Sequence, residues 1–233
     1  KKKCINKANL IFAISENTKN DLIKIYDINP SKIKVVYLGF KSFPKLSSSF
    51  EMNSKILQTP FILFVGQRSG YKNFDGFIEA YNSSIFLKNN YNIVSFGGGV
   101  FSDEELNIFD KYNINEKIFH LKGGDDVLKS CYENASVFIY PSKYEGFGIP
   151  PLEAMSCGTP VCCSNVSSIP EIVKNAAVFF DPTKDKEIAN ALKSVLKSEI
   201  TKKDLILKGK KRLNFFTWEK SSDESLTAYK SLL

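Results

Sequence analysis

Short apolar runs alternate with longer amphipathic stretches along most of this chain, and this alternation constrains the fold more than any other feature of the sequence. Strands that alternate with helices at this spacing favour a parallel sheet with helices on both faces. We therefore expect a doubly wound α/β domain. The strands are predicted at Phe61–Val65, Ile93–Phe96, Lys117–Leu121, Val137–Tyr140, Val161–Cys163 and Val178–Phe180.

Amphipathic periodicity predicts a helix in most of the segments that separate these strands. Such sheets bind ligands beyond the carboxyl ends of their strands, so the loops after each strand are where function is sought. The helices are predicted at Asn73–Leu87, Asp103–Tyr112, Asp125–Asn134, Pro151–Ser156 and Lys184–Lys197, with a terminal pair at Lys202–Phe216 and Glu219–Leu232.

The first 40 residues form a separate predicted unit. A strand at Leu10–Ile14 leads into a helix that Ser15 caps, and a second strand follows at Ile33–Tyr37. This is too little to bury a core alone. A Ser- and Lys-rich segment follows and is typical of a linker. The predicted division is 1–40, a linker at 41–58, the main α/β domain at 59–200 and terminal helices at 201–233.

Composition excludes several classes of protein. The five cysteines form no CxxC pair, which favours a reducing cytoplasm, and His120 is the only histidine. A histidine-rich metal site is therefore excluded, and very little room is left for a Ser-His-Asp mechanism. The net charge of +7 permits an anionic partner without identifying one. Since no apolar run approaches the roughly 18 residues of a membrane span, no transmembrane segment is expected.

The turn after the first predicted strand of the main domain carries two cations just before a helix. Arg68 can fork onto two phosphate oxygens, and Lys72 adds a point charge between Gly66 and the predicted helix start at Asn73. A phosphate site and a solvated turn both remain open here. The glycine run around Gly98 allows either close approach of a ligand or a tight turn.

The segment from Tyr140 to Met155 carries the strongest signal. It leads from a strand end through a glycine-rich turn into a helix, where free backbone N–H groups can receive an anion. Glu145 precedes the turn and Glu153 lies inside the helix, so both can accept hydrogen bonds from sugar or ribose hydroxyls. The alternative is a loop carboxylate and a helix-surface charge without function.

Four further residues favour structural roles. The adjacent Cys162 and Cys163 fall in an apolar strand and are interpreted as small core residues. His120 at a strand end is interpreted as structural. Trp218 is interpreted as a packing anchor for the last helix.

The segment Tyr140–Met155, with seven residues between Glu145 and Glu153, resembles the signature of retaining GT-B glycosyltransferases of glycosyltransferase family 4. The resemblance extends along nearly the whole chain. Other matching segments are Ala8–Leu22, Phe61–Asn73, Gly158–Glu171 and Phe216-Thr217-Trp218. The resemblance implies that the main domain is the carboxyl-terminal, Rossmann-like half of a GT-B fold. Residues 1–40 would then be the tail of an amino-terminal acceptor domain, and residues 201–233 would pack back toward that domain.

The resemblance also implies roles for individual residues. Arg68 and Lys72 would bind the donor diphosphate, Glu145 the hydroxyls of the transferred sugar, and Glu153 the ribose. Gln67 stands where the family runs directly from Gly to Arg, a departure that bears on Arg68. The implied catalytic residues are Glu145, Lys72 and Arg68, and the implied donor-binding residues are Gly66, Arg68, Lys72, Asn73, Gly98, Glu145, Gly146, Phe147, Gly148, Ile149 and Glu153.

The implied reaction is metal-independent transfer of a hexose, mannosyl or glucosyl, from a UDP-, GDP- or ADP-sugar to a glycan or glycolipid hydroxyl, with retention. No cofactor is expected. Because the chain begins with Lys1, we expect an amino-terminal domain to be missing and this piece to be inactive alone. The full enzyme is expected in the cytoplasm, in peripheral contact with the inner membrane face. The alternatives are a non-catalytic nucleotide-sugar or glycan-binding module and, third, an RNA-binding protein; no nucleic-acid partner is expected.

Overall fold

A computed structural model describes residues 2–43 and 54–232 of the chain. Within these residues the main body is a six-stranded, all-parallel sheet with strand order β5-β4-β3-β6-β7-β8. This is the strand order of a doubly wound Rossmann-like sheet. The predicted fold class is therefore confirmed. The strands are β3 (Phe61–Val65), β4 (Asn92–Phe96), β5 (Ile118–Leu121), β6 (Val137–Tyr140), β7 (Val161–Ser164) and β8 (Val178–Phe180).

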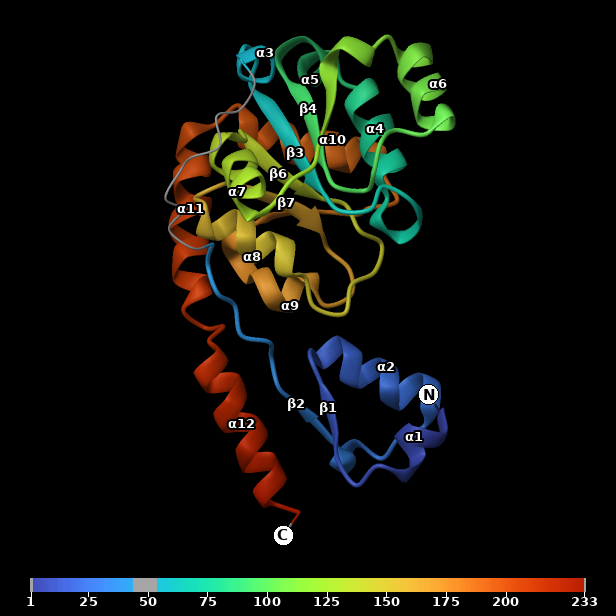
Figure 1. Cartoon of the computed structure of the whole chain (residues 1–233), viewed down its shortest axis with the longest axis vertical. Coiled ribbons are helices and arrows are strands. Elements are labelled where there is room, and N and C mark those ends of the chain that lie inside the picture. The colour runs from blue at the N-terminus through green and yellow to red at the C-terminus, as the bar shows by residue number, and fades with distance from the viewer. Residues whose placement is uncertain (1, 44–53, 233) are drawn as a thin grey trace.

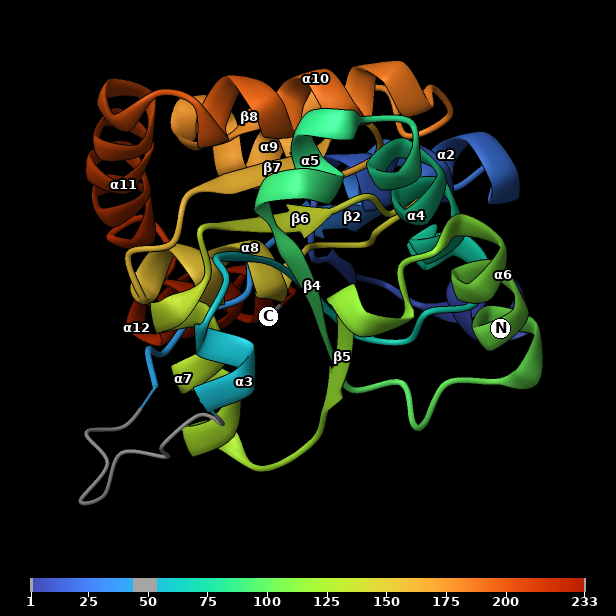
Figure 2. The same ribbon diagram turned by 90° about the horizontal axis from the view of Figure 1, so that it is seen from above.

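Both faces of the sheet are buried, which explains why its strands are continuous apolar runs. In β3, Ile62 and Phe64 point into one core and Leu63 and Val65 into the other. The first core is shared with α4 (Phe74–Asn82), α5 (Ile85–Asn90), α6 (Asp103–Tyr112) and α10 (Asp185–Leu196); the second is shared with α7 (Asp125–Asn134), α8 (Ile149–Ser156) and α9 (Ile169–Val173). Figures 1 and 2 show the sheet between these helices.

The helix predicted at Asn73–Leu87 is wrong as a single element, because the chain breaks it after α4. Helix α4 ends with Ser83 as its C-cap, and Ser84 then caps α5 by accepting a hydrogen bond from the Leu87 N–H. Sequence analysis also missed α1 (Lys2–Lys7), α3 (Ser54–Leu57) and α9. The chain also contains four 3₁₀ turns and two terminal helices in the described residues. These are η1 (Pro30–Lys32), η2 (Gly70–Lys72), η3 (Asn115–Lys117), η4 (Lys174–Ala176), α11 (Glu199–Leu213) and α12 (Trp218–Lys230).

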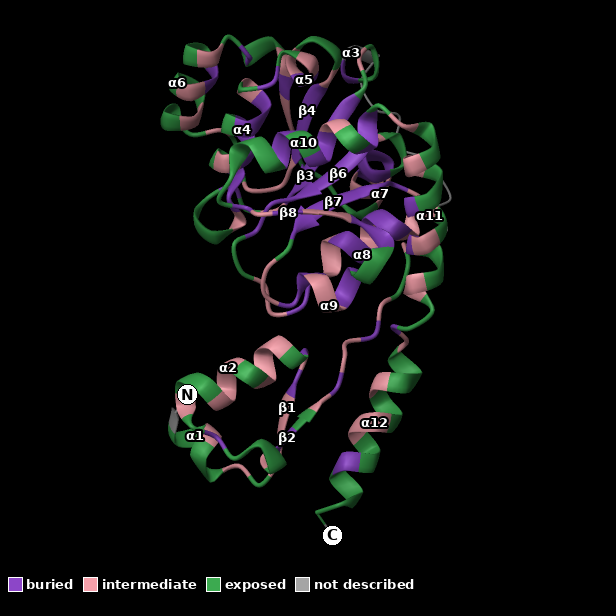
Figure 3. Ribbon diagram, turned by 180° about the vertical axis from the view of Figure 1, so that it is seen from behind, coloured by how far each residue is buried: buried purple, intermediate pink, exposed green. Residues whose placement is uncertain are grey.

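The amino-terminal unit is small. β1 (Ile11–Ala13) pairs in parallel with β2 (Ile33–Val35), and α2 (Glu16–Tyr26) connects them. Its buried core consists of Ala13, Ile28 and Ile33. Figure 3 shows how much more of this unit and of α12 is exposed than of the main sheet. Of the predicted linker, residues 44–53 lie outside the described residues, and the rest includes α3.

The last helix runs alongside the amino-terminal unit and is tied to the segment that follows β2 (Figure 1). The Phe40 N–H donates to the Phe216 carbonyl, and the Phe12 and Tyr229 rings make an edge contact at 5.2 Å between centroids. Trp218, at the start of α12, packs on Gly39, while about half of its surface (53%) stays exposed.

We predict that Gly39→Ala separates α12 from this segment. A Cβ atom at Gly39 would lie 2.5 Å from the Trp218 ring and 2.6 Å from its Cα, so backbone must shift. Overpacking of this kind is expected to lower the free energy of unfolding by about 1–3 kcal/mol. Denaturant titration followed by the fluorescence of Trp218, the chain's only tryptophan, measures both the stability and the local change.

The matched control is Gly124→Ala, where the nearest obstacle is the flexible carboxylate of Asp126. An unchanged emission spectrum and an unchanged unfolding midpoint for Gly39→Ala would contradict the predicted packing.

Candidate functional site

The site lies where the topology reverses. After β3 the chain crosses toward β4, and after β6 it crosses toward β7, so the loops that follow these two neighbouring strands open a crevice at one edge of the sheet. The first loop carries Lys72 and the second carries Glu145. The two loops are joined by a hydrogen bond of 2.7 Å from the Lys143 N–H to the Tyr71 carbonyl.

Lys72 and Glu145 form an ion pair at this switch point. The Lys72 Nζ lies 2.7 Å from the Glu145 Oε1, and it also donates to the Tyr140 hydroxyl at 3.3 Å. The two charged side chains are only 15% and 12% exposed. Lys72 also lies over the Tyr140 ring, 5.0 Å from its centroid. The structure therefore brings together two of the three residues predicted to be catalytic, in a partly dehydrated place where electrostatic interactions are strong.

The backbone around Glu145 is held by two serines from the loop after β7. The Glu145 N–H donates to the Ser167 Oγ at 2.9 Å. The buried Ser168 hydroxyl is 2.8 Å from the Glu145 carbonyl and 2.9 Å from the Phe147 carbonyl. Sequence analysis missed both serines, although a Ser-Ser pair in the loop that follows a predicted strand was the available signal.

The glycine-rich turn leads into α8 earlier than predicted. Gly148 has φ 113°, a conformation that favours glycine, and Ile149 is already the first helical residue. Pro150 and Pro151 are then the second and third helical residues, and neither has an N–H. The backbone donors left for an anion at this helix start are consequently those of Gly148 and Ile149.

Glu153 lies in different surroundings from Glu145. It accepts a hydrogen bond of 2.9 Å from the Tyr132 hydroxyl. It lines a cavity of ≈ 330 Å³ with Asp125 and with Lys41, Ser42 and Phe43 of the segment that leads away from β2. Burial raises the pKa of Glu153, the Tyr132 hydroxyl opposes this, and nearby Asp125 adds to it. Glu145 is not among the residues that line this cavity.

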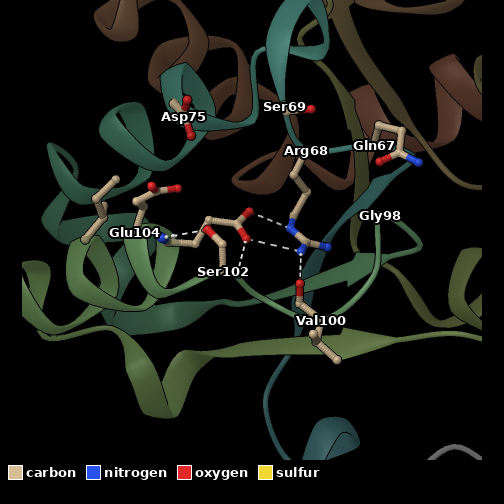
Figure 4. Close-up of a pocket in the computed structure, with 10 residues that line it drawn as sticks. Gln67, Arg68, Ser69, Asp75, Gly98, Val100, Ser102 and Glu104 are labelled. Atoms are coloured by element: carbon tan, nitrogen blue, oxygen red, sulfur yellow. Dashed lines mark hydrogen bonds and ion pairs between the residues drawn. The ribbon is translucent and has the colours of Figure 1, made fainter.

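Arg68 is not part of the Lys72–Glu145 pair. Its Nε and Nη2 donate to the Glu105 carboxylate at 2.6 and 3.2 Å. Its Nη1 donates to the Gly97 and Gly99 carbonyls, both at 2.9 Å, and Nη2 also donates to the Val100 carbonyl at 2.8 Å. All five N–H donors of the buried guanidinium are therefore engaged. Figure 4 shows Arg68 and its bond to Val100 at the wall of a cavity of ≈ 400 Å³.

The capping box that receives Arg68 could have been found from sequence. The Ser102 hydroxyl caps α6 by accepting from the Glu105 N–H, and the Ser102 N–H donates to the Glu105 carboxylate, as the S-x-x-E spacing predicts. Gly98 leaves room for the Arg68 guanidinium, because a Cβ atom at this position would lie 2.9 Å from the Arg68 Nη1 and 3.0 Å from the Gly66 carbonyl.

Three other residues singled out in the sequence occupy structural positions. Asn73, with φ 58°, precedes α4 and donates from its amide to the Pro182 carbonyl at 2.8 Å, so it ties the turn after β3 to the loop after β8. Gly66 has φ 125° and lies beside the Lys72 side chain. Burial, then the charge of Arg68, lowers the pKa of His120, which packs on Phe101. The predicted donor contacts of Asn73 and Gly66 stay predictions.

The described part of the chain, residues 2–43 and 54–232, contains neither a cluster of metal ligands nor a membrane-spanning helix. In these residues no three or more His, Cys, Asp or Glu side chains are grouped so that they could hold a metal ion. Among the helices described there, none combines the length and the apolar character needed to cross a bilayer.

The strand order and the helices on both faces define the class of protein as a Rossmann-like α/β domain of the kind found in GT-B proteins, with a charged pair at the switch point of its sheet. Residues 48–212 match the family model described as glycosyl transferases group 1. The chain belongs to this family.

Sequence relatives agree with this assignment. The chain is 28% identical over 236 residues to the O-antigen chain mannosyltransferase B of Escherichia coli, covering 98% of this chain and 62% of that protein. It is 27% identical over 232 residues to an uncharacterized glycosyltransferase of Methanocaldococcus jannaschii, covering 94% and 59%. The chain thus spans about three fifths of the length of these relatives.

Solved structures show the same fold. Sucrose-phosphate synthase from Thermosynechococcus elongatus superposes with a TM-score of 0.81 at 22% identity, covering 99% of this chain and 60% of that one. HepE of Anabaena in complex with UDP-glucose superposes with a TM-score of 0.77 at 16% identity, covering 99% and 66%.

We predict that Glu105→Gln destabilises the chain in a pH-dependent way. Burial alone would raise the pKa of Glu105, but hydrogen bonds from Arg68 and Ser102 outweigh it and lower that pKa. At neutral pH the substitution is expected to lower the free energy of unfolding by about 1.5–3 kcal/mol, the range for a hydrogen bond to a charged group.

The pH dependence follows from the direction of the shift. Since the pKa of Glu105 is lower in the folded chain than the value of about 4.3 in the unfolded chain, its contribution is complete above that pH and is lost as the pH falls through the folded value. The difference between wild type and Glu105→Gln in urea titrations is thus expected to shrink between pH 5 and pH 3. The exposed neighbour Glu104, substituted to Gln, serves as control. A constant difference across this range would count against the pair.

Proposed function

We propose that this chain is the donor-binding part of a retaining glycosyltransferase, which transfers a hexose from a nucleotide-diphospho-sugar to an acceptor hydroxyl. The observation that carries the proposal is the Lys72–Glu145 pair, 2.7 Å apart at the switch point of the sheet. The relative named as an O-antigen chain mannosyltransferase supports mannose as the sugar and polysaccharide synthesis as the setting. The structural neighbour with bound UDP-glucose supports a nucleotide sugar as the donor.

In the proposed mechanism Lys72 stabilises the leaving diphosphate. The charge that develops on the leaving oxygen meets a cation that two loops already hold in place, so little reorganisation is needed. The amides of Gly148 and Ile149 at the start of α8 add their dipoles. Lys72 and these amides then supply the charge stabilisation that a divalent metal ion supplies in other transferases.

Glu145 and Glu153 bind hydroxyl groups in the proposal. A diphosphate near Lys72 competes with Glu145 for the ammonium group, and the freed carboxylate can accept hydrogen bonds from the sugar ring. Glu153 already accepts from one hydroxyl, that of Tyr132, and faces a cavity that a ribose can enter. Backbone from Gly146 to Ile149 lies between the two.

Arg68 enters the proposal as a support. To reach a diphosphate it would have to leave Glu105 and three carbonyl groups. We assign it instead to holding the turn at residues 97–100 beside Gly66, on the same edge of the sheet as Lys72. The diphosphate cation of the proposal is therefore Lys72.

The remaining parts of the proposal concern the full-length enzyme to which this chain would belong. A second Rossmann-like domain would bind a glycan or glycolipid acceptor, and this chain alone would transfer little sugar. The full enzyme would work in the cytoplasm, at the inner membrane face. A non-catalytic module that kept the donor site is the competing function, and it differs in having no transferase activity.

We predict that one nucleoside diphosphate family stabilises this chain selectively. Thermal shift and calorimetric titration against UDP, GDP, ADP and their sugar conjugates measure this, because a ligand that binds the native state raises stability by about 2.7 kcal/mol at 100 times its Kd. Glu153→Ala, which removes the proposed ribose contact, is expected to abolish this stabilisation. No binding by any of these ligands at millimolar concentration would contradict the proposed donor site. Steeply salt-dependent binding to oligonucleotides instead would support an RNA-binding protein.

We further predict that Lys72→Ala in the full-length protein lowers kcat about 10²- to 10³-fold, as the loss of one preorganised donor does elsewhere. Circular dichroism and denaturation check that the fold is intact. The matched control is Lys143→Ala, which removes an exposed lysine from the Glu145 loop. Wild-type turnover in Lys72→Ala would rule out the assigned role, and absence of transfer by the wild-type protein, despite donor binding, would favour the non-catalytic module.

A further inference from the structure

The amino-terminal unit contacts the loop that carries Glu145. Helix α2 lies beneath the loops that follow β6 and β7 (Figure 1). The fully buried Ser15 Oγ, which caps α2 by accepting from the Thr18 N–H at 3.0 Å, also donates to the Gly146 carbonyl at 2.7 Å. The Thr18 hydroxyl reaches the same carbonyl at 3.3 Å. A residue that the sequence identifies as a local cap thus makes a second contact, with the carbonyl of the residue that follows Glu145.

A carboxylate from the main domain holds the same helix start from outside. The Glu171 carboxylate, on α9, accepts from the Glu16 N–H at 3.0 Å and the Asn17 N–H at 3.1 Å. These are free amides at the positive end of the α2 dipole, where a carboxylate is stabilising. Glu171 also accepts from the Tyr37 hydroxyl at 3.2 Å.

Glu171 itself sits on a fixed backbone. The Arg212 guanidinium donates to the Glu171 carbonyl at 2.8 Å and to the Ile172 carbonyl at 2.6 Å. It also stacks on the Phe215 and Phe216 rings, 4.5 and 4.7 Å from their centroids. The contact between α2 and the main domain therefore rests on a rigid support.

The loop around Glu145 is consequently held from two sides. Ser167 and Ser168 bind its backbone from the main domain, and Ser15 binds it from the amino-terminal unit. A third contact with α2 comes from the Tyr144 hydroxyl, which donates to the Asp21 carboxylate at 2.5 Å. Lys72, in contrast, is on the β3 loop, which contacts this loop through the Lys72–Glu145 ion pair and the Lys143 amide.

We propose that Ser15, Thr18 and Glu171 form a latch, here called the α2 latch, that positions the Glu145 carboxylate. The inference rests on the proposed function, in which Glu145 binds the sugar ring and Lys72 the diphosphate. The Ser15 and Thr18 hydroxyls hold the carbonyl of the residue that follows Glu145, and no contact of the latch in the described structure falls next to Lys72. The latch therefore governs recognition of the sugar and leaves diphosphate binding largely untouched. Ser15 is thus a positioning residue that makes the sugar site depend on the docking of α2.

The test compares Ser15→Ala with Ser198→Ala in this chain. Ser198 caps α11 by accepting from the Thr201 N–H and does not contact the Glu145 loop in the described structure, so its loss is a matched loss of a helix cap. Hydrogen–deuterium exchange of residues 144–148 reports on the latch itself. Calorimetry with the selected nucleoside diphosphate and with its sugar conjugate reports on its consequence.

We expect Ser15→Ala to speed hydrogen–deuterium exchange in residues 144–148. We also expect it to weaken binding of the sugar conjugate about fivefold, the equivalent of one net hydrogen bond. Binding of the diphosphate alone is expected to change less than about twofold. Ser15→Thr, which keeps the hydroxyl, is expected to restore both readouts, and Ser198→Ala to leave them unchanged. Glu171→Gln is expected to act in the same direction as Ser15→Ala.

The outcomes separate the two proposals. Unchanged exchange in Ser15→Ala overturns the latch. Faster exchange with equal loss of affinity for diphosphate and conjugate overturns its role in sugar recognition. If the wild-type chain binds neither ligand, the proposed function fails, and exchange still decides whether Ser15 holds the loop.

Discussion

The pairing of β3 with β6 is the constraint on which the rest of the structure depends. Their register sets Ile62 beside Val137 and Leu63 beside Phe138. These four residues are 0% exposed, so the sheet has no room for polar chemistry in its interior. Charged groups are therefore confined to the strand ends. There the loops after β3 and β6, which leave in opposite directions, face each other. The Lys72–Glu145 pair is a consequence of this topology, because nothing local to either loop brings the two residues together.

The two cations of the first loop, Arg68 and Lys72, have different hydrogen-bond partners because their side chains differ in geometry. A guanidinium has five donors in a fixed plane and matches a carboxylate together with a ring of carbonyl groups. Arg68 finds that set in Glu105 and the turn at residues 97–100, and it becomes a buried part of the scaffold. A lysine is a point charge on a flexible stem, and Lys72 has only Glu145 and the Tyr140 hydroxyl as hydrogen-bond partners in the described structure. An ammonium held by few partners can exchange one of them for a phosphate.

Local signals predicted the elements well, and long-range partners not at all. Continuous apolar runs marked all the strands of the main sheet, and Ser102 with Glu105 formed the capping box that their spacing allows. The resemblance predicted that Lys72 and Glu145 serve one ligand, and the structure brings them together. The placement of Arg68 could not be predicted, because its acceptors come from a different loop. Ser15 shows the same limit, since its role as a cap is local while its bond to Gly146 spans 131 positions in sequence.

The chemistry of the α2 latch bears on what can open it. Its donors are amides, hydroxyls and the Tyr37 phenol. Burial, and after it the charge of Glu171, raises the pKa of Tyr37 to about 12, so the phenol keeps its proton throughout the physiological range. The Tyr37 ring packs on Phe147, Phe215 and Phe216, which keeps the chain that leaves β2 against the main domain. Because none of these donors titrates near neutral pH, the latch responds to the position of α2 and not to protonation. A movement of the amino-terminal unit is then transmitted to the Glu145 loop through the Gly146 carbonyl and the Tyr144 hydroxyl.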